Sequence, residues 1–196
     1  MFKRVFDILI SFFGLLFLIP FFVLISFLIL FSSRGGIFYS QKRVGKNGRD
    51  FLLIKFRTMK TGSDKKGLLT VGGKDSRITR IGYYLRKYKV DELPQLLNVL
   101  VGDMSLVGPR PEVRKYVDLY SAQQLQVLKV RPGITDYASI QYIDENEILG
   151  KSSNPEKTYI EEIMPEKLKL NLKYIETQSF LVDMKIIFST ILKIFR

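Results

Sequence analysis

Two adjacent carboxylates, Asp91 and Glu92, stand at the start of a stretch that reads as a helix from Val90 to Val99. Pro94 fits the first turn of such a helix, because first-turn N–H groups have no intrahelical partner. A carboxylate at a helix N-terminus lies in a positive field that keeps it ionised and that also attracts phosphate. The pair therefore favours attack on phosphorus, and an ordinary acidic helix cap is the alternative.

A second candidate is Arg110, which lies between Pro109 and Pro111. The two prolines stiffen the backbone, and the planar guanidinium can grip a phosphate through two hydrogen bonds. A plain rigid turn is the alternative for this segment. Further cations that could contact a diphosphate are Arg57, Arg77, Arg80 and Arg86, some of which we expect to form structural ion pairs.

The composition narrows the remaining chemistry. The chain of 196 residues has no histidine and no cysteine, which excludes His-based triads, thiolate nucleophiles, disulfides and the usual zinc sites. Lysine and arginine total 31 against 19 acidic residues, so the net charge is +12, which suits nucleic acid, anionic lipid or phosphorylated small molecules. At this length we expect one catalytic unit.

The apolar residues decide between those partners, because they are concentrated at the N-terminus. No charged residue occurs from Ile8 to Ser33, about 26 residues, whereas a membrane-spanning helix needs about 20. A signal peptide is disfavoured by the length of the run and the lack of a small-residue cleavage site before Arg34. A simple membrane anchor remains the alternative to a bent segment.

Two details favour the bent segment. Pro20 lies near the middle of the run, where it removes a backbone hydrogen bond and bends a helix. Lys3 and Arg4 precede the run and Arg34 follows it, so both ends carry the positive charge of cytoplasmic flanks. Each arm would have about 12 residues, or roughly 18 Å of helix, which reaches into one leaflet only. We predict a re-entrant helix-break-helix at residues 1–34.

Residues 35–196 are predicted to form the cytoplasmic catalytic domain. Ile37–Gln41 and Asp50–Arg57 have strand patterns and suit a β-hairpin. Thr61–Ser76 lacks periodicity and predicts a mobile loop beside the site. Ser179–Arg196 has apolar residues at helical spacing and predicts an interfacial amphipathic helix, with an ordinary core helix as the alternative. The fold class is therefore α+β, mainly helical with a small β-hairpin.

Taken together, the motifs resemble those of the bacterial sugar transferase family, specifically the small monotopic polyprenyl-phosphate phosphoglycosyl transferases. The resemblance covers nearly the whole chain, and several motifs in order are more specific than any one of them. It is carried by Lys3-Arg4 with Phe6-Asp7, Gln41 with Arg43 and Gly45, Lys55-Phe56-Arg57-Thr58-Met59, Arg77 and Arg80, Leu85-Arg86, Asp91-Glu92-Leu93-Pro94-Gln95-Leu96 with Asn98-Val99-Leu100, Gly102-Asp103-Met104-Ser105, Val107-Gly108-Pro109-Arg110-Pro111, and Arg131-Pro132-Gly133-Ile134-Thr135.

This resemblance implies a ping-pong phosphoglycosyl transfer with a magnesium ion at the cytoplasmic face of the bacterial inner membrane. Asp91 would attack the β-phosphate of a UDP-sugar, release UMP and carry the phosphosugar, which polyprenyl (undecaprenyl) phosphate then takes. Glu92 would help to place the metal or the incoming phosphate, and both carboxylates are the expected metal ligands. Magnesium suits them because it prefers hard oxygen ligands and bridges carboxylates and substrate phosphates.

Three departures from the family pattern limit what the resemblance implies. Ile19 stands where a small residue usually precedes the helix-breaking proline. After Thr135, the usual Gly-Trp-Ala-Gln and a following Asn-Gly-Arg are replaced by Asp136-Tyr137-Ala138-Ser139 and an acidic stretch, so the donor sugar does not carry over. The extra transmembrane domain of larger relatives is not expected.

Two rival functions remain open. One is a non-enzymatic protein that binds the membrane surface through its basic patch. The other is a hydrolase of nucleotide sugars, for which the same carboxylates would serve. No recognisable nucleic-acid module is present, so nucleic acid is not an expected partner. The sequence does not determine the oligomeric state, and a homo-oligomer is compatible with it.

Overall fold

The computed structural model describes residues 2–63, 67, 69–72 and 75–194. Most of them are helical, with two small sheets, which confirms the mainly helical α+β class. Part of the loop predicted for 61–76 lies outside the described residues, as do positions 195 and 196 of the predicted C-terminal helix. The elements are α1 (Phe2–Ser32), β1 (Phe38–Val44), η1 (Lys46–Gly48), β2 (Asp50–Phe56), α2 (Arg80–Lys87), η3 (Val90–Glu92), α3 (Gln95–Val101), β3 (Ser105–Val107), α4 (Arg114–Val117), η4 (Gln124–Lys129), β4 (Gly133–Thr135), α5 (Tyr137–Gln141), α6 (Glu145–Lys151), α7 (Pro155–Thr158), η5 (Tyr159–Ile163), α8 (Met164–Thr177) and α9 (Phe180–Ile194).

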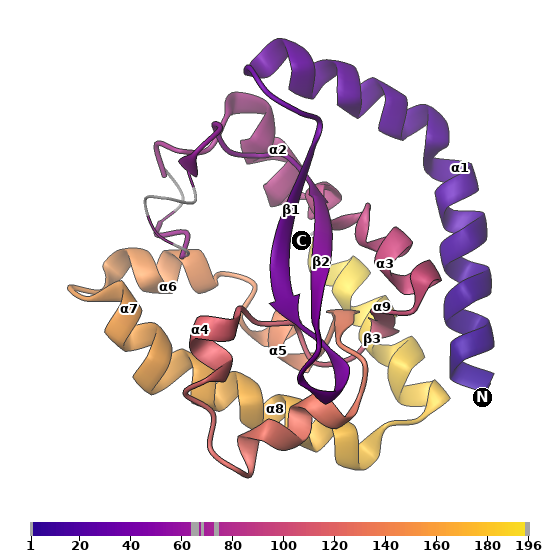
Figure 1. Ribbon diagram of the computed structural model, residues 1–196, viewed down its shortest axis with the longest axis vertical. Helices are drawn as coiled ribbons and strands as arrows, with labels where there is room; N and C mark the ends of the chain where they lie inside the picture. Colours follow the sequence, from indigo (N-terminus) through magenta and orange to yellow (C-terminus); the bar gives the residue numbers. More distant parts are fainter. Residues whose placement is uncertain (1, 64–66, 68, 73–74, 195–196) are drawn as a thin grey trace.

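The long helix α1 runs along one side of the molecule and then bends. Its C-terminal part crosses one end of the molecule and lies beside α2 (Figure 1). Pro20 lies inside this helix, and the chain remains helical on both sides of it. The predicted break at Pro20 is therefore wrong in detail. A proline removes a single N–H from the hydrogen-bond ladder, so a helix can bend there and continue.

Few residues of α1 are buried, and its apolar side chains are mostly exposed. Among the described residues, α1 is the one helix that is long and apolar enough to cross a bilayer. The buried positions fall near its two ends, at Asp7 and Ser11 and at Ile25 and Ile29. The buried positions therefore lie in both halves of the helix, Leu15, Leu18 and Phe22 pack against the core between them, and most of the apolar surface of α1 is left uncovered.

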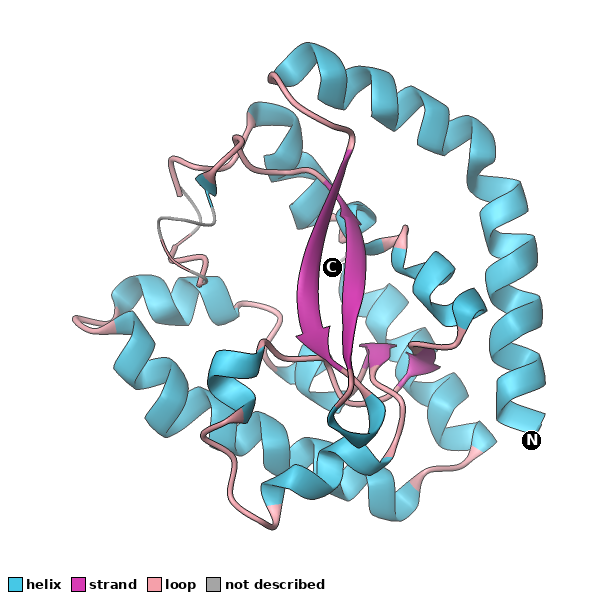
Figure 2. Cartoon of the chain, in the orientation of Figure 1, coloured by secondary structure: helices cyan, strands magenta, loops and turns pink. Residues whose placement is uncertain are grey.

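The predicted β-hairpin is confirmed as the antiparallel pair β1 and β2, which crosses the centre of the molecule in Figure 2. Phe38 pairs with Phe56 and Val44 with Asp50. A second, parallel pair joins β3 to β4, with Ser105 opposite Gly133 and Val107 opposite Thr135. This pair was not predicted, because strands of three residues are too short to show an alternating pattern.

The core has one cluster of buried residues against each end of α1 and a third beneath α8. The first surrounds Val99 and Met104 and includes Tyr174 of α8. The second joins Ile25 and Ile29 of α1 to Phe56 and to Leu85 of α2. Two of these clusters therefore tie α1 to the elements that carry the candidate site.

The C-terminal helix forms close to the predicted boundaries, as α9. Its face toward the core is occupied by Ile186 and Asp183, which are buried. The exposed large apolar side chains are Phe180, Leu181, Phe188, Ile191 and Leu192. The helix therefore packs one face against the core, to which Ile187 also contributes, and leaves other apolar side chains exposed; its placement at the membrane interface stays a prediction.

Candidate active site

The carboxylate pair lies in a single tight turn, η3, rather than in the first turn of a long helix. Glu92 N donates to Lys89 O (3.2 Å) and Leu93 N donates to Val90 O (3.2 Å), which closes the turn. Pro94 caps α3, which begins at Gln95. The predicted helix from Val90 to Val99 is therefore divided, and Asp91 stands before the helix instead of in its first turn.

Glu92 is the paired member of the two carboxylates. Its Oε1 accepts from Lys55 Nζ (2.8 Å) and from Arg110 Nη2 (2.5 Å), and its Oε2 accepts from Arg110 Nη1 (3.2 Å). Burial alone would raise the pKa of Glu92, but Arg110 and Lys55 outweigh burial and hold this pKa well below its ordinary value. Glu92 is thus held ionised between two cations.

Asp91 is the unpaired member. It is buried, and its carboxylate has no hydrogen bond or ion pair within the part of the chain that the structure describes. Burial raises its pKa and the charge of Glu92 adds to the rise, while Lys55 and Arg86 oppose it. We expected a helix N-terminus to favour the ionised form. The structure differs because the helix starts later and the side chain is buried.

The turn at Arg110 is held from its backbone. Asp136, which is fully buried, accepts from Arg110 N (3.2 Å) and from Ser139 N (2.6 Å). Pro109 O accepts from Gly133 N (3.0 Å). A Cβ on Gly133 would lie 2.0 Å from Gly108 N, so the two strands can approach this closely only with glycine there. These contacts aim Arg110 at Glu92.

Arg86 approaches Asp91 from α2. Its Nε donates to Thr58 Oγ1 (2.9 Å) and its Nη1 donates to Thr70 Oγ1 (3.0 Å). A Cβ on Gly82 would lie 2.0 Å from Thr58 O, so a glycine lets α2 pack directly on this backbone. Both partners of Arg86 are neutral hydroxyls, so its positive charge remains available to an anion.

The structure does not bring the other predicted arginines to the carboxylates. Arg57 donates to the carbonyls of Arg34 (2.5 Å) and Ser33 (2.7 Å), where it caps the end of α1. Arg77 forms an ion pair with Asp75 (2.6 Å) and also donates to loop carbonyls. Arg80 is exposed at the start of α2. The diphosphate role predicted for these three finds no support in their positions.

Lys55 is a site residue that the sequence reasoning missed. It lies on β2, its side chain is largely buried, and burial lowers its pKa even though Glu92 acts to raise it. The sequence contained a sign of this role. Lys55 lies two residues after Leu53 and therefore on the same face of the strand, and Leu53 is buried. A lysine that faces the interior requires an anionic partner, and the fold supplies Glu92.

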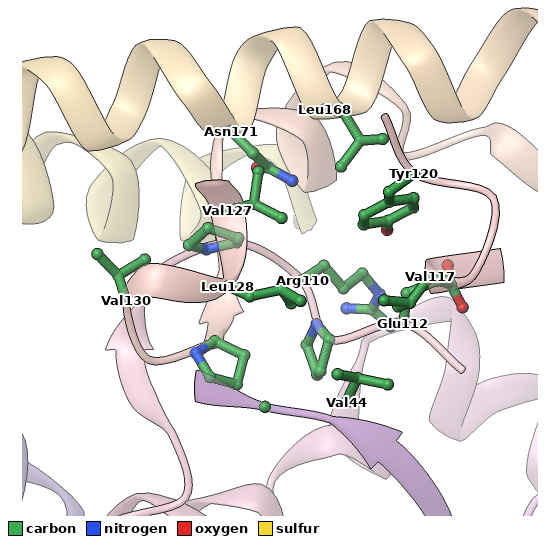
Figure 3. Close-up of a pocket in the computed structure, with 14 residues that line it drawn as sticks. Val44, Arg110, Glu112, Val117, Tyr120, Val127, Leu128, Val130, Leu168 and Asn171 are labelled. Atoms are coloured by element: carbon green, nitrogen blue, oxygen red, sulfur yellow. The ribbon is translucent and has the colours of Figure 1, made fainter. Parts of the chain in front are cut away.

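A small cavity lies behind the Arg110 turn, between that turn and α8 (Figure 3). Its volume is about 20 Å³, and side chains such as Val127, Leu128 and Leu168 surround it. This volume accommodates about one water molecule. It is too small for a nucleotide or a sugar, so the candidate site is the carboxylate turn and not this cavity.

The metal-binding capacity of the turn is limited. In the ranges that the structure covers, no three acidic, histidine or cysteine side chains are grouped so that they could hold a metal ion together. A carboxylate has about four lone-pair sites, and Lys55 and Arg110 occupy three of those on Glu92. Asp91 is therefore the more available oxygen ligand. The pair fits a magnesium ion that takes its remaining ligands from substrate phosphates and water.

Comparison with known proteins finds one family along the whole chain. Residues 1–196 match the family described as bacterial sugar transferase. The chain is 36% identical over 192 residues to the UDP-N-acetylgalactosamine-undecaprenyl-phosphate N-acetylgalactosaminephosphotransferase of Aeromonas hydrophila, which covers 96% of this chain and 42% of that protein. It is 35% identical over 206 residues to the exopolysaccharide production protein ExoY of Sinorhizobium fredii, which covers 96% and 83% respectively.

A third relative has a different donor in its name. The UDP-glucose:undecaprenyl-phosphate glucose-1-phosphate transferase of Escherichia coli is 35% identical over 195 residues, or 97% of this chain and 39% of that protein. The chain thus spans less than half of this relative and of the Aeromonas protein, and most of ExoY.

Proposed function

Because this chain belongs to the bacterial sugar transferase family, we propose that it transfers a sugar 1-phosphate from a UDP-sugar to polyprenyl phosphate. The observation that carries this proposal is that the two carboxylates of the turn are bound differently. Glu92 is bound by two cations, whereas Asp91 keeps its carboxylate unbonded within the described residues. An unbonded, buried carboxylate beside cations suits a nucleophile toward a phosphorus atom.

The proposed reaction has two steps. In the first, an oxygen of Asp91 attacks the β-phosphorus of the UDP-sugar, and the bond between that phosphorus and the bridging oxygen breaks. UMP leaves with the bridging oxygen, and the phosphosugar stays on Asp91 as an acyl phosphate. In the second, an oxygen of polyprenyl phosphate attacks the same phosphorus and releases the Asp91 carboxylate. The product is a polyprenyl diphosphate sugar.

The residues around Asp91 have matching tasks in this proposal. Arg86 offers its charge to the diphosphate, because only hydroxyl groups bind it in the structure. Arg110 would share its fork between Glu92 and a phosphate oxygen. Glu92 keeps Lys55 and Arg110 in place. Magnesium, held by Asp91 and the last lone pair of Glu92, would neutralise charge on the diphosphate.

The placement of α1 supports a re-entrant membrane segment. Near its start, Arg4 donates to Val99 O (2.6 Å) and Asp7 accepts from Ser105 Oγ (2.7 Å). Near its end, Ile29 and Ser33 bind Arg57. Since both ends hold the same catalytic unit, a helix that crosses to the far side of the bilayer would break one set of contacts. We propose that both ends lie at the cytoplasmic face.

Cysteine labelling tests this topology, because the natural chain contains no cysteine. Single variants Phe2→Cys and Phe38→Cys place a thiol at an exposed position before and after the segment. A reagent that does not cross the inner membrane should label neither in intact cells and both in inverted vesicles. Labelling of Phe2→Cys from the outside would overturn the re-entrant placement.

The relatives include proteins named for N-acetylgalactosamine, glucose and exopolysaccharide production. We therefore propose that this chain catalyses the first membrane step in the biosynthesis of a glycan such as exopolysaccharide. The donor sugar is to be identified by experiment. UMP release should be measured with polyprenyl phosphate for UDP-N-acetylgalactosamine, UDP-glucose and other UDP-sugars.

The decisive test uses the purified chain with magnesium and an active donor but no acceptor. The peptide that contains Asp91 should gain the mass of one phosphosugar. If no adduct forms without polyprenyl phosphate and turnover is normal once it is added, direct transfer between the two substrates would replace the covalent mechanism. Turnover that needs no polyprenyl phosphate would favour the hydrolase, and the absence of UMP release from every donor would favour the non-enzymatic membrane binder.

A further inference from the structure

Lys89 lies directly before the carboxylate turn in an unusual backbone conformation. Its φ is 55° and its ψ is 17°, which is the left-handed region that residues with a Cβ seldom adopt. The conformation is fixed from both sides, because Lys89 N donates to Arg86 O (3.1 Å) and Lys89 O accepts from Glu92 N (3.2 Å). The reversal of the chain at Lys89 connects the end of α2 to the two carboxylates.

The ammonium group of Lys89 differs from the other cations near Asp91. Lys55 and Arg110 bind Glu92, and Arg86 binds two hydroxyls. Lys89 has no side-chain hydrogen bond or ion pair with any residue that the structure describes. Its charge nevertheless acts on both carboxylates, with a smaller effect on the pKa of Asp91 than the charges of Lys55 and Arg86 have. A cation without a partner at this place can bind an incoming anion.

The neighbours of Lys89 indicate the side from which that anion comes. Val90 packs against the cluster that contains Ile25 and Ile29 of the apolar helix α1. Tyr84 and Tyr88, at the end of α2, are exposed. Tyrosine side chains of this kind suit the boundary between lipid and water. Lys89 is therefore flanked along the chain by the exposed Tyr88 and by Val90, which packs against the cluster that contains the apolar helix α1.

We propose that Lys89 binds the phosphate of the polyprenyl acceptor and guides it from the membrane boundary to the phosphorus carried by Asp91. This inference rests on the two-step transfer proposed above. The donor also carries phosphate groups, but Arg86 already acts on Asp91 and Arg110 already binds Glu92. An acceptor anchored in lipid must reach the same phosphorus past α1 and α2, and Lys89 is a cation acting on Asp91 that has no hydrogen bond or ion pair among the described residues.

The test measures the two half-reactions separately in neutral detergent, so that anionic lipid contributes nothing. Formation of the Asp91 adduct is followed in a single turnover without acceptor, and transfer is then started with undecaprenyl phosphate. Lys89→Asn removes the charge but keeps a residue that tolerates the left-handed conformation. Lys89→Arg keeps the charge. Lys87→Gln is the matched control, because it removes one charge from the exposed end of α2.

Lys89→Asn should raise the KM for undecaprenyl phosphate about ten-fold, the effect of one charge-assisted hydrogen bond, while adduct formation stays within about two-fold of wild type. Lys89→Arg should restore most of the acceptor affinity, and Lys87→Gln should change neither half-reaction. An unchanged KM for the acceptor, or slowing confined to adduct formation, would overturn the proposal. If wild type forms no adduct, the two-step function fails, and this is seen before any variant is compared.

Discussion

Two charge-rich regions of this molecule use similar residues to opposite ends. Where α1 meets the catalytic unit, Asp7 accepts from Ser105 and Leu106, and Lys3 pairs with Asp183 (2.5 Å). At the carboxylate turn, Glu92 is paired in the same manner, but Asp91 is buried without such a partner among the described residues. The difference separates charges that hold elements together from a charge kept available for chemistry.

Asp91→Asn should have the largest effect on activity. The amide is a poor nucleophile, so turnover should fall by several decades, while the fold stays intact because only an unpaired charge is removed. UMP release and circular dichroism of the same preparation check both statements. Near-normal UMP release from the variant would remove Asp91 from its nucleophilic role and erase the contrast between the two regions.

Arg110→Lys tests whether the shape of the guanidinium matters as well as its charge. A lysine keeps the charge but cannot hold Glu92 and a phosphate with a planar fork. One charge-assisted hydrogen bond is worth about 1.5 to 3 kcal/mol, so kcat/KM should fall by roughly one to two decades. Arg49→Lys, at an exposed position, is the control. Unchanged kinetics would make Arg110 a turn residue only.

Neutralising the two carboxylates should change the stability of the protein in opposite directions at neutral pH. Glu92 has a lowered pKa, so its contribution is fully present above 4.5 and is lost as the pH falls through the lower folded-state value. Glu92→Gln should cost about 2 kcal/mol at neutral pH, less than a fully buried pair, because the Arg110 side chain is 33% exposed.

Asp91 has a raised pKa, so its ionisation lowers stability as the pH rises from 3.8 through the raised value. Asp91→Asn should therefore melt at a higher temperature than wild type at pH 7, and this advantage should vanish near pH 4. Melting temperatures of wild type and both variants between pH 4 and 8 check the signs. Shifts of the same direction in both variants at pH 7 would contradict the division between a paired and an unpaired carboxylate.

Arg57→Lys probes the other region and should have the smallest effect on catalysis. Its guanidinium binds the last carbonyls of α1, so the loss of the fork should lower the melting temperature and leave kcat/KM of the folded enzyme within about two-fold. Arg49→Lys again serves as the control. A raised KM for the donor without any loss of stability would return Arg57 to the substrate site.

The motifs of the sequence identified residues that the fold brings together, but they did not predict every contact that these residues make. Asp91, Glu92 and Arg110 could be selected because their residue types suit phosphate chemistry, and the structure brings Arg110 onto Glu92. The β-hairpin was predictable from its alternating pattern. The pairing of Lys55 with Glu92 was not, because it depends on how β2 lies against the turn.

The arginines illustrate the same limit. Arg57, Arg77 and Arg86 are equally basic in sequence. Tertiary contacts assign Arg57 to the end of α1 and Arg86 to the neighbourhood of Asp91, whereas Arg77 pairs locally with Asp75, two residues before it. The division between η3 and α3 also escaped prediction, because Pro94 is compatible both with a first helical turn and with a cap.

The anchoring of α1 at both ends has a consequence for how the chain is made. Arg4 and Asp7 bind Val99 and Ser105, and Lys3 binds Asp183, so their partners follow them by 95 to 180 positions. During synthesis from the N-terminus, the apolar helix leaves the ribosome long before those partners exist. Its apolar surface must be kept from water during this interval, and its composition suits a lipid bilayer. Folding of the later residues would then bring α1 into its final, bent conformation.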